Sequence, residues 1–286
     1  MAEIVSGKQV AAAYREELKA KVLTLKDEGI KPALTVILIG DNPASHSYVK
    51  GKQKACQEVG IVSNLIVKSD SITEEELLQL IDEQNNDESV HGILVQLPLP
   101  KHINELKVIE RISPYKDVDG FHPISVGRLL TGQDTFVPCT PQGILELVKR
   151  QSFEISGKHV VVIGRSNIVG KPVSQLFLQQ HATVTICHSR TKNLKEITLQ
   201  ADILIAAVGK AHMIDGSYIK QGAFVIDVGV NRLNNGSLTG DIDFDSAVEK
   251  ASYITPVPGG VGPMTITMLL ANTVKAAETL HTEKIS

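Results

Sequence analysis

Lys52 is a cationic side chain in a stretch whose pattern predicts burial. Residues 45–59 have helical periodicity, and at about 100° per residue Lys52 falls on the apolar stripe. Its neighbours on that stripe are Tyr48, one turn earlier, and Ala55, Cys56 and Val59. Burial disfavours the charged form of an amine, so an inward lysine could transfer protons near neutral pH. The alternative is a lysine whose stem packs on the core while its amine reaches solvent.

Gln96 is a second polar residue in an apolar setting. It stands near the carboxyl end of a strand pattern over residues 92–97. A glutamine satisfied by a neighbouring loop is the simpler interpretation. However, α/β proteins bind ligands at the carboxyl ends of parallel strands. Two such interruptions together favour a site that contains Lys52 and Gln96.

Two turn-rich segments add candidates. Lys116–Gly120 (Lys-Asp-Val-Asp-Gly) has the composition of an Asx turn that ends in glycine, which requires no function. Pro256–Pro263 has three glycines among three prolines, so it is stiff yet lets another group approach its backbone. Pro263 begins the last predicted helix, whose free N–H groups would face this loop. A rigid corner between domains is the alternative for the second segment.

The segment 159–172 combines a strand, a turn and a helix start. The apolar run Val160–Ile163 ends at Gly164, and Gly170 precedes a helical pattern. This order places backbone N–H groups where an anion can bind, as in dinucleotide folds. The match to G-x-G-x-x-G is imperfect because Ser166 occupies the second glycine position. Many βα units use such glycines for packing alone, which is the alternative.

The strand pattern at 182–187 indicates which cofactor this fold would prefer. Enzymes that use NAD usually carry Asp or Glu at the end of this strand to bind the ribose hydroxyls. Here the chain continues His188-Ser189-Arg190, without an acid. Together with Arg165, these hydroxyl and guanidinium groups suit a 2′-phosphate. The pattern therefore favours NADP, and His188 is interpreted as a strand-end residue without catalytic duty.

The elements that must position these residues alternate between strands and helices. Strands are predicted at 33–39, 61–67, 92–97, 159–163, 182–187, 202–206 and 223–228. Helices are predicted at 7–29, at 45–59, from Ser71 or Thr73, from Thr140 (N-cap) and Pro141, and from Pro263 to about Leu280. This βαβ rhythm predicts two α/β domains with mostly parallel sheets. The turn-rich residues 131–141 are the predicted boundary.

Composition limits the class of protein. The chain has 286 residues, 42% hydrophobic and 21% charged, with a net charge of −3, which gives no electrostatic case for nucleic acid or an acidic membrane. No apolar segment approaches the roughly 20 residues that cross a bilayer. The N-terminus lacks a signal pattern and is expected to run directly into a helix. Cys56, Cys139 and Cys187 have no metal or redox spacing, so we expect a reduced, cytoplasmic protein.

Together these motifs resemble the bifunctional methylenetetrahydrofolate dehydrogenase/methenyltetrahydrofolate cyclohydrolase family in its bacterial two-domain form. The resemblance covers essentially the whole chain, and the family's glycine turn has serine where Ser166 stands. The motifs that carry it are Tyr48–Lys52, Val95–Pro100, Lys116–Gly120, Pro138–Pro141, Gly164–Gly170 and Pro256–Thr265.

The resemblance implies two reactions on folate-bound one-carbon units. A hydride passes from 5,10-methylenetetrahydrofolate to NADP⁺, and water then converts the methenyl product to 10-formyltetrahydrofolate. The alternatives are a monofunctional methylenetetrahydrofolate dehydrogenase, against which Lys52 and Gln96 count, and a non-catalytic folate- or nucleotide-binding protein.

The resemblance also implies roles for individual residues. Lys52 would be central to hydrolysis, with Gln96 bonded to it, while Tyr48 stacks on the folate and Asp119 anchors the pterin. The remaining substrate contacts would be Leu97, Pro98, Gly262 and Pro263. The cofactor residues would be Gly164, Arg165, Ser166, Ser189, Arg190 and Val230, and no metal is implied.

The implied fold has an N-terminal α/β catalytic domain and a Rossmann-like NADP-binding domain, with the active site in the cleft between them. The folate-binding domain would comprise residues 1–139 joined by the C-terminal helix 264–286, and the NADP-binding domain residues 140–263. Members of the family usually form homodimers through the nucleotide domain.

Overall fold

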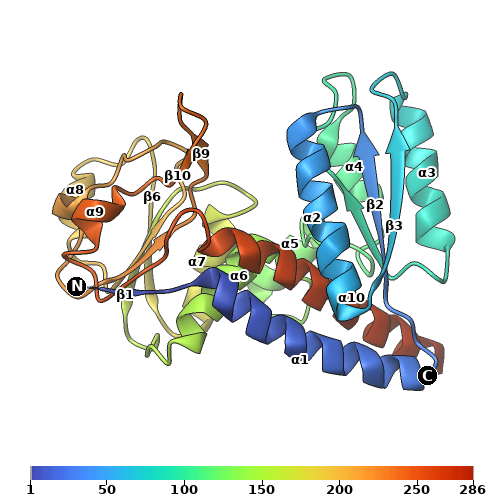
Figure 1. Cartoon of the computed structure of the whole chain (residues 1–286), viewed down its shortest axis with the longest axis horizontal. Helices are drawn as coiled ribbons and strands as arrows, with labels where there is room; N and C mark the ends of the chain where they lie inside the picture. Colours follow the sequence, from blue (N-terminus) through green and yellow to red (C-terminus); the bar gives the residue numbers. More distant parts are fainter. Residues whose placement is uncertain (1, 286) are drawn as a thin grey trace. The chain divides into compact units, whose positions relative to one another are not determined.

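The computed structural model describes residues 2–285, with the side chains of 282–285 left out of the description. The chain forms two compact units (Figure 1). Unit 1 comprises Met1–Ala12 and Thr140–Thr265, and unit 2 comprises Ala13–Cys139 and Ile266–Ser286. The chain therefore passes between units at Cys139–Thr140, within the predicted boundary, and at two further points that lie inside long helices.

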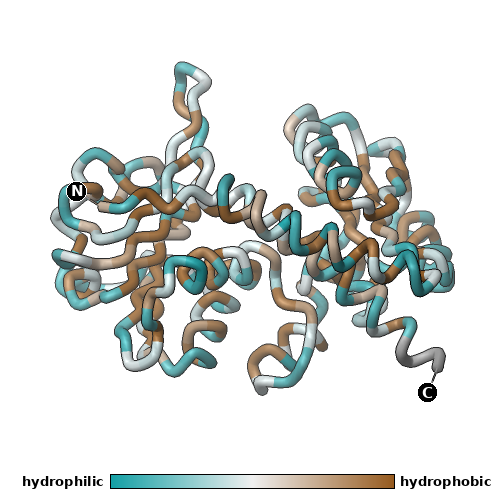
Figure 2. The backbone as a smooth tube through the Cα atoms, turned by 60° about the horizontal axis from the view of Figure 1, so that its bottom comes forward, coloured by the Kyte–Doolittle hydropathy of each residue, from teal (hydrophilic) through white to brown (hydrophobic). Residues whose placement is uncertain are grey.

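Unit 1 is built on a parallel sheet of six strands in the order β1-β11-β8-β7-β5-β6. The strands are β1 (Glu3–Ile4), β11 (Tyr253–Ile254), β8 (Phe224–Asp227), β7 (Ile203–Ala206), β5 (His159–Ile163) and β6 (Thr183–Cys187). Hydrophobic residues, brown in Figure 2, follow one another along this sheet. Every residue of β7 and β8 is buried. Because β5 lies between β6 and β7, the strand order reverses there, which is where doubly wound sheets bind ligands.

The other elements of unit 1 are helices and one hairpin. The helices are α6 (Cys139–Arg150), α7 (Gly170–Gln179), α8 (Leu194–Thr198), α9 (Phe244–Ala247) and the 3₁₀ turn Gly216–Tyr218. The hairpin pairs β9 (Asn231–Arg232) with β10 (Leu238–Thr239). Phe224 stacks on Tyr253 with ring centroids 5.0 Å apart, which seats the short strand β11 against β8.

Unit 2 contains a three-stranded parallel sheet in the order β3-β2-β4. Its strands are β2 (Ala33–Ile39), β3 (Val62–Lys68) and β4 (Gly92–Val95), and the central strand β2 is buried throughout. The helices are α1 (Gly7–Asp27), α2 (Pro43–Val59), α3 (Glu74–Asn86), α4 (Glu105–Arg111), α5 (Pro123–Thr131) and α10 (Val261–Ile285). Within this unit α1 and α10 lie side by side, with Lys21 Nζ 2.8 Å from Glu278 Oε2.

Capping side chains fix two helix starts. Thr73, not Ser71, caps α3 through a capping box in which its backbone N–H donates to Glu76 Oε2 at 2.8 Å. Asn42 caps α2 by accepting from the N–H groups of Ala44 and Ser45, so the helix begins at Pro43, earlier than predicted.

Other predictions about element boundaries are also wrong. The N-terminus forms β1 before α1, because Glu3–Ile4 pairs with Tyr253–Ile254. Thr140 is not an N-cap, since α6 already begins at Cys139 and the Thr140 hydroxyl lies 2.9 Å from that of Thr265. The last helix begins at Val261, not at Pro263.

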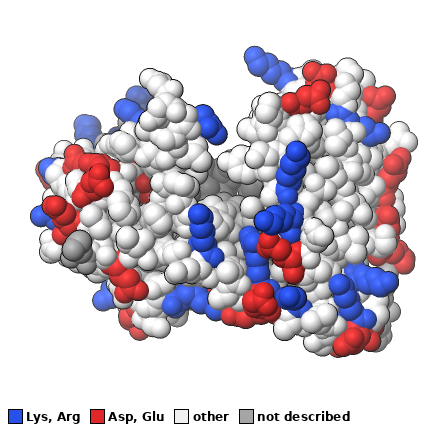
Figure 3. All heavy atoms as spheres, viewed as in Figure 1, with Lys and Arg blue, Asp and Glu red and all other residues white. Residues whose placement is uncertain are grey.

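The charges on the face shown in Figure 3 are mixed, with acidic and basic side chains interspersed on both units. This distribution is what the small net charge of −3 predicts. Among residues 2–285, no helix combines the length and apolarity that crossing a bilayer requires.

Candidate functional site

The structure brings Lys52 and Gln96 together in unit 2. Lys52 Nζ, on α2, donates to Gln96 Oε1 at 3.0 Å, directly beyond the last residue of β4. The Gln96 amide nitrogen donates to Leu97 O at 2.8 Å, which turns the amide oxygen toward the lysine. The backbone N–H of Gln96 donates to Ile37 O at 2.8 Å. Gln96 is therefore held at the carboxyl edge of the sheet, as predicted.

Two residues of the stripe predicted to be buried are more exposed than expected. Lys52 is half-buried and Tyr48 is 56% exposed, whereas Ala55, Cys56 and Val59 are buried. Other residues in the same turns as Tyr48, Ser45 and Val49, are buried. Tyr48 therefore presents its ring to solvent from a helix whose first turns are otherwise packed on the core.

The Lys116–Gly120 turn separates two aspartates with different surroundings. Asp117 is buried, and its Oδ2 accepts from His122 N at 2.8 Å and from Ser125 Oγ at 3.0 Å. This carboxylate holds the loop and the start of α5. Lys116 closes the end of α3 by donating to Asp87 O at 2.7 Å. Both residues make structural contacts, although Asp117 accepts from residues 121, 122 and 125 and not from the i+2 N–H that defines an Asx turn.

Asp119 is the member of this turn that remains accessible. It is half-buried, and with Leu97 it lines a cavity of about 20 Å³ whose other walls come mainly from β4 and α4. Burial raises the pKa of Asp119 to about 6; the charge of Lys52 opposes the shift and Asp117 adds to it. The charge of Lys52 thus acts on Asp119, while the hydrogen bond of Lys52 joins it to Gln96, the residue before Leu97.

The cysteines of the chain are unpaired and buried. Burial raises the pKa of the Cys56 thiol to about 11, although Ser63 and the charge of Lys52 lower it in part. The pKa of Cys139 is raised well above its usual value by burial and by Asp119. Neither thiol has the lowered pKa of a nucleophile.

In unit 1, packing accounts for both glycines of the Gly164–Gly170 turn. A Cβ on Gly164, whose φ is +138°, would lie 2.4 Å from Ala207 O. A Cβ on Gly170 would lie 2.3 Å from Gly164 O. Ser166 Oγ accepts from the N–H groups of Val169 and Gly170 at 3.2 and 3.3 Å. The serine therefore closes the turn onto α7 where the generic fingerprint has a glycine.

The structure brings three predicted cofactor residues to one edge of the six-stranded sheet. Ile163 pairs with Cys187, and Gly164 N donates to Cys187 O at 2.8 Å, so the segments after β5 and β6 are neighbours. Arg165, Ser189 and Arg190 are exposed on these segments. The His188 ring accepts from Arg190 N at 3.1 Å, which shapes this turn. A guanidinium-rich edge without a carboxylate after β6 fits a phosphate better than a ribose hydroxyl.

Two buried carboxylates that sequence analysis missed hold the neighbouring strand ends. Asp241 accepts from the N–H groups of Val208, Gly209 and Lys210 at 2.6, 3.0 and 2.8 Å, beyond β7. Asp227, at the end of β8, accepts from the N–H of Asp241 at 2.9 Å, and burial raises its pKa to about 6. The close fit of Gly240 against Asp227 Oδ2, where a Cβ would lie 1.8 Å away, shows in the structure and not in the sequence. Their position makes them supports for the loop that carries Val230, which is 55% exposed.

The remaining predicted substrate residues are Pro98, Gly262 and Pro263. Pro98 is exposed after Leu97. Gly262 and Pro263 form the first turn of α10, in the part of that helix that belongs to unit 1. Among the side chains described, those of residues 2–281, no group of three His, Cys, Asp or Glu is arranged to hold a metal ion.

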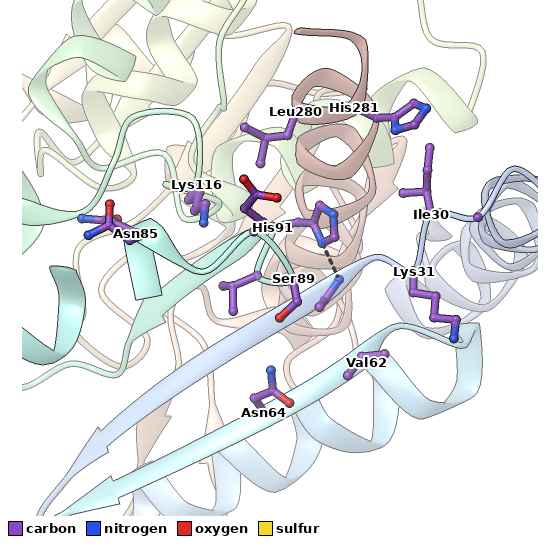
Figure 4. Close-up of a pocket in the computed structure, with 15 residues that line it drawn as sticks. Ile30, Lys31, Val62, Asn64, Asn85, Ser89, His91, Lys116, Leu280 and His281 are labelled. Carbon is purple, nitrogen blue, oxygen red and sulfur yellow. Dashed lines mark hydrogen bonds between the residues drawn. The ribbon is translucent and has the colours of Figure 1, made fainter. Parts of the chain in front are cut away.

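A groove of about 700 Å³ lies at the opposite end of the unit 2 sheet (Figure 4). It is lined at the amino ends of the strands by Ala33, Val62 and His91, and His91 Nδ1 accepts from Ala33 N at 3.2 Å. None of the predicted site residues lines it. Size therefore does not identify the site, whereas the converging polar groups do.

Comparisons with known proteins show the family of this chain. The family model "Tetrahydrofolate dehydrogenase/cyclohydrolase, catalytic domain" matches residues 5–119, and the model for the NAD(P)-binding domain of the same family matches residues 138–281. The bifunctional protein FolD of Oceanobacillus iheyensis is 63% identical over 98% of this chain and 99% of its own length.

Two solved structures extend the comparison. The bifunctional FolD of Campylobacter jejuni has a TM-score of 0.96 and 51% identity, covering 98% of this chain and 99% of its own. The FolD of Trypanosoma brucei, solved with NADP cofactor and an inhibitor, has a TM-score of 0.92 and 39% identity, covering 97% of this chain and 98% of its own. With both domain models matched in order and relatives aligned over nearly their full length, this chain belongs to the tetrahydrofolate dehydrogenase/cyclohydrolase family.

Proposed function

We propose that this chain oxidises 5,10-methylenetetrahydrofolate with NADP⁺ and then hydrolyses the 5,10-methenyl product to 10-formyltetrahydrofolate. The observation that carries this proposal is the hydrogen bond between Lys52 Nζ and Gln96 Oε1 at the carboxyl edge of the unit 2 sheet. Hydride transfer needs aligned reactants but no acid–base residue. An amine held beside an amide serves the hydrolytic step, so its presence favours two activities over the monofunctional alternative.

For hydrolysis, we assign proton transfer to Lys52. Water adds to the methenyl carbon and gives up one proton, and the carbon–N5 bond then breaks as the second water proton moves to N5. The reaction consumes the methenyl cation and water and yields 10-formyltetrahydrofolate and one proton. Lys52 is the group that we assign to receive the first proton, and Gln96 keeps the amine in place through the 3.0 Å bond.

For substrate binding, we assign the donor edge of the pterin to Asp119. The amino and ring N–H groups of a pterin require an acceptor, and Asp119 offers a half-buried carboxylate beside Leu97. Tyr48 offers its exposed ring as a stacking surface for the folate. Leu97, Pro98, Gly262 and Pro263 complete the proposed contacts. Unit 2 would thus be the folate-binding domain.

For cofactor binding, we assign the carboxyl edge of unit 1. Gly164, Arg165 and Ser166 would hold the phosphates, Ser189 and Arg190 the 2′-phosphate, and Val230 the nicotinamide side. The exposed basic and hydroxyl groups after β5 and β6 support this assignment. NADP⁺, when bound, supplies the acceptor for the hydride.

We further propose that the protein acts as a homodimer through unit 1, in the cytoplasm. The sheet of unit 1 ends at β6, whose Ile186 is 42% exposed, and an apolar edge strand of this kind is suited to covering by a second copy. The unpaired state of Cys56, Cys139 and Cys187 supports a reducing compartment.

An absorbance assay tests the proposed function. The protein is mixed with 5,10-methylenetetrahydrofolate and either NADP⁺ or NAD⁺, and methenyl absorbance is followed with time. We expect the signal to rise with NADP⁺ and then to decay as hydrolysis proceeds. Methenyl absorbance that then falls no faster than without enzyme would leave only the dehydrogenase. If neither methenyl product nor NADPH formed, the dehydrogenase activity would be refuted.

A further inference from the structure

Asn272 is a buried amide in the middle of α10, where an apolar residue would be expected. Its exposed fraction is 3%, and it lies among buried residues that include Leu269, Val274 and Ala276. A buried amide is costly unless its hydrogen bonds are made, and asparagine is a poor helix former. An asparagine at this position therefore requires hydrogen-bond acceptors nearby, to which an apolar side chain could not donate.

Those partners are two backbone carbonyls from separate segments of unit 2. Asn272 Nδ2 donates to Val118 O at 2.8 Å and to Val137 O at 3.0 Å. Val118 directly precedes Asp119, and Val137 belongs to the segment that leads into Cys139. The two hydrogens of one amide group thus join the aspartate-bearing turn to a second segment.

The same two segments are in tight contact at the next residues. Gly120 has a φ of +72°, and a Cβ there would lie 2.7 Å from both Pro138 N and the carbonyl carbon of Val137. Cys139 Sγ lies 3.4 Å from Val118 O and 4.0 Å from Asp119 Oδ1. The backbone on either side of Asp119 is therefore fixed, and Asn272 is the side chain that bridges both segments.

We propose that Asn272 is a positioning residue for the substrate, because it sets the position from which Asp119 presents its carboxylate. This inference rests on the proposed function, in which Asp119 binds the pterin. Asn272 bonds these two carbonyls, with Cys139 Sγ 3.8 Å from its Nδ2, so it acts on the substrate through the backbone that carries Asp119. The two carbonyls lose their common donor when Asn272 is replaced, and the turn then gains freedom at the residue before Asp119.

The experiment compares Asn272→Leu with a matched control, Thr273→Val. Thr273 is also buried in α10, but its hydroxyl donates to Leu269 O at 2.9 Å within the same helix. We expect Asn272→Leu to raise the Kd for tetrahydrofolate, measured by calorimetry, about tenfold, with the Kd for NADP⁺ unchanged. Thr273→Val should leave both constants at wild-type values. An unchanged tetrahydrofolate Kd in Asn272→Leu, or an equal change in the control, would overturn the inference.

A double-mutant cycle with Asp119→Ala separates positioning from a general structural effect. If Asn272 acts through Asp119, Asn272→Leu adds no further loss of tetrahydrofolate affinity in the Asp119→Ala background. Additive losses would overturn the inference. Normal affinity in Asp119→Ala alone would instead refute the proposed role of Asp119. Should Asn272→Leu not fold, Asn272→Ser replaces it, and the same non-additivity is required.

Discussion

Replacing Lys52 with methionine tests the role of the amine, because the substitution removes the amine and keeps an unbranched side chain. Methionine keeps an unbranched stem of similar length, so the half-buried site on α2 stays filled and no cavity forms. The change removes the donor to Gln96 Oε1 at 3.0 Å, and this acceptor is itself only half-buried, so water can replace the lost partner. The free energy of unfolding should therefore change by about 1 kcal/mol or less.

The effect on hydrolysis should be far larger than the effect on stability. A positioned acid–base group contributes about 10²–10⁴ in rate, equivalent to roughly 3–5 kcal/mol of activation free energy. We expect Lys52→Met to slow methenyltetrahydrofolate hydrolysis by this factor. The Kd for NADP⁺ should stay unchanged, because the residues proposed to bind it after β5 and β6 belong to unit 1.

The assay is the decay of methenyl absorbance, corrected for the uncatalysed rate, with Lys54→Met as the matched control. Lys54 is exposed on the same helix, so its replacement removes the same charge without touching Gln96. Hydrolysis by Lys52→Met within about threefold of wild type, or an equal loss in Lys54→Met, would refute proton transfer by Lys52.

The other predictions concern the cofactor, the pterin and the glycine turn. Arg165→Ala should raise the KM for NADP⁺ far more than that for NAD⁺ in steady-state kinetics, since only NADP⁺ has a 2′-phosphate; equal losses would contradict this. The pKa of Asp119 is raised to about 6, so its carboxylate is lost as pH falls through that value, and the KM for methylenetetrahydrofolate should rise there. Asp119→Asn should bind folate weakly at every pH, and a retained pH dependence would point to another group. Gly170→Ala should lower the free energy of unfolding in urea by about 1–3 kcal/mol, because its Cβ would lie 2.3 Å from a backbone oxygen. Gly127→Ala, with no atom within 4 Å of the new Cβ, should not destabilise; equal losses would refute the steric argument.

Strands bounded by glycine were the best predicted part of the fold. The segments 33–39 and 159–163 match β2 and β5 to the residue, because each is mainly apolar, largely buried on both faces and closed by a glycine. The two-residue strands β1 and β11 have no such run. They form because each finds a partner far away in the sequence, which local periodicity does not record.

The residues of the candidate site also differ in whether a local sequence pattern marks them. Lys52 and Gln96 stand out in the sequence because each is polar in an apolar pattern. Asn272 and Asp241 were missed because their partners are backbone carbonyls and N–H groups, which every residue possesses. Periodicity predicts the side of α2 on which Tyr48 lies, but it does not predict that the ring is exposed there.

The pairing of β1 with β11 has a consequence for the synthesis of the chain. Glu3–Ile4 is made about 250 residues before its partner Tyr253–Ile254. Pairing between such distant segments is slow, so β8 waits with an open edge until β11 arrives between it and β1. A polypeptide that ends before residue 253 would leave the edge of β8 unpaired. Unpaired apolar strand edges pair with other chains and so promote aggregation. The last strand of the sheet to be made is thus the one that protects the growing protein from aggregation.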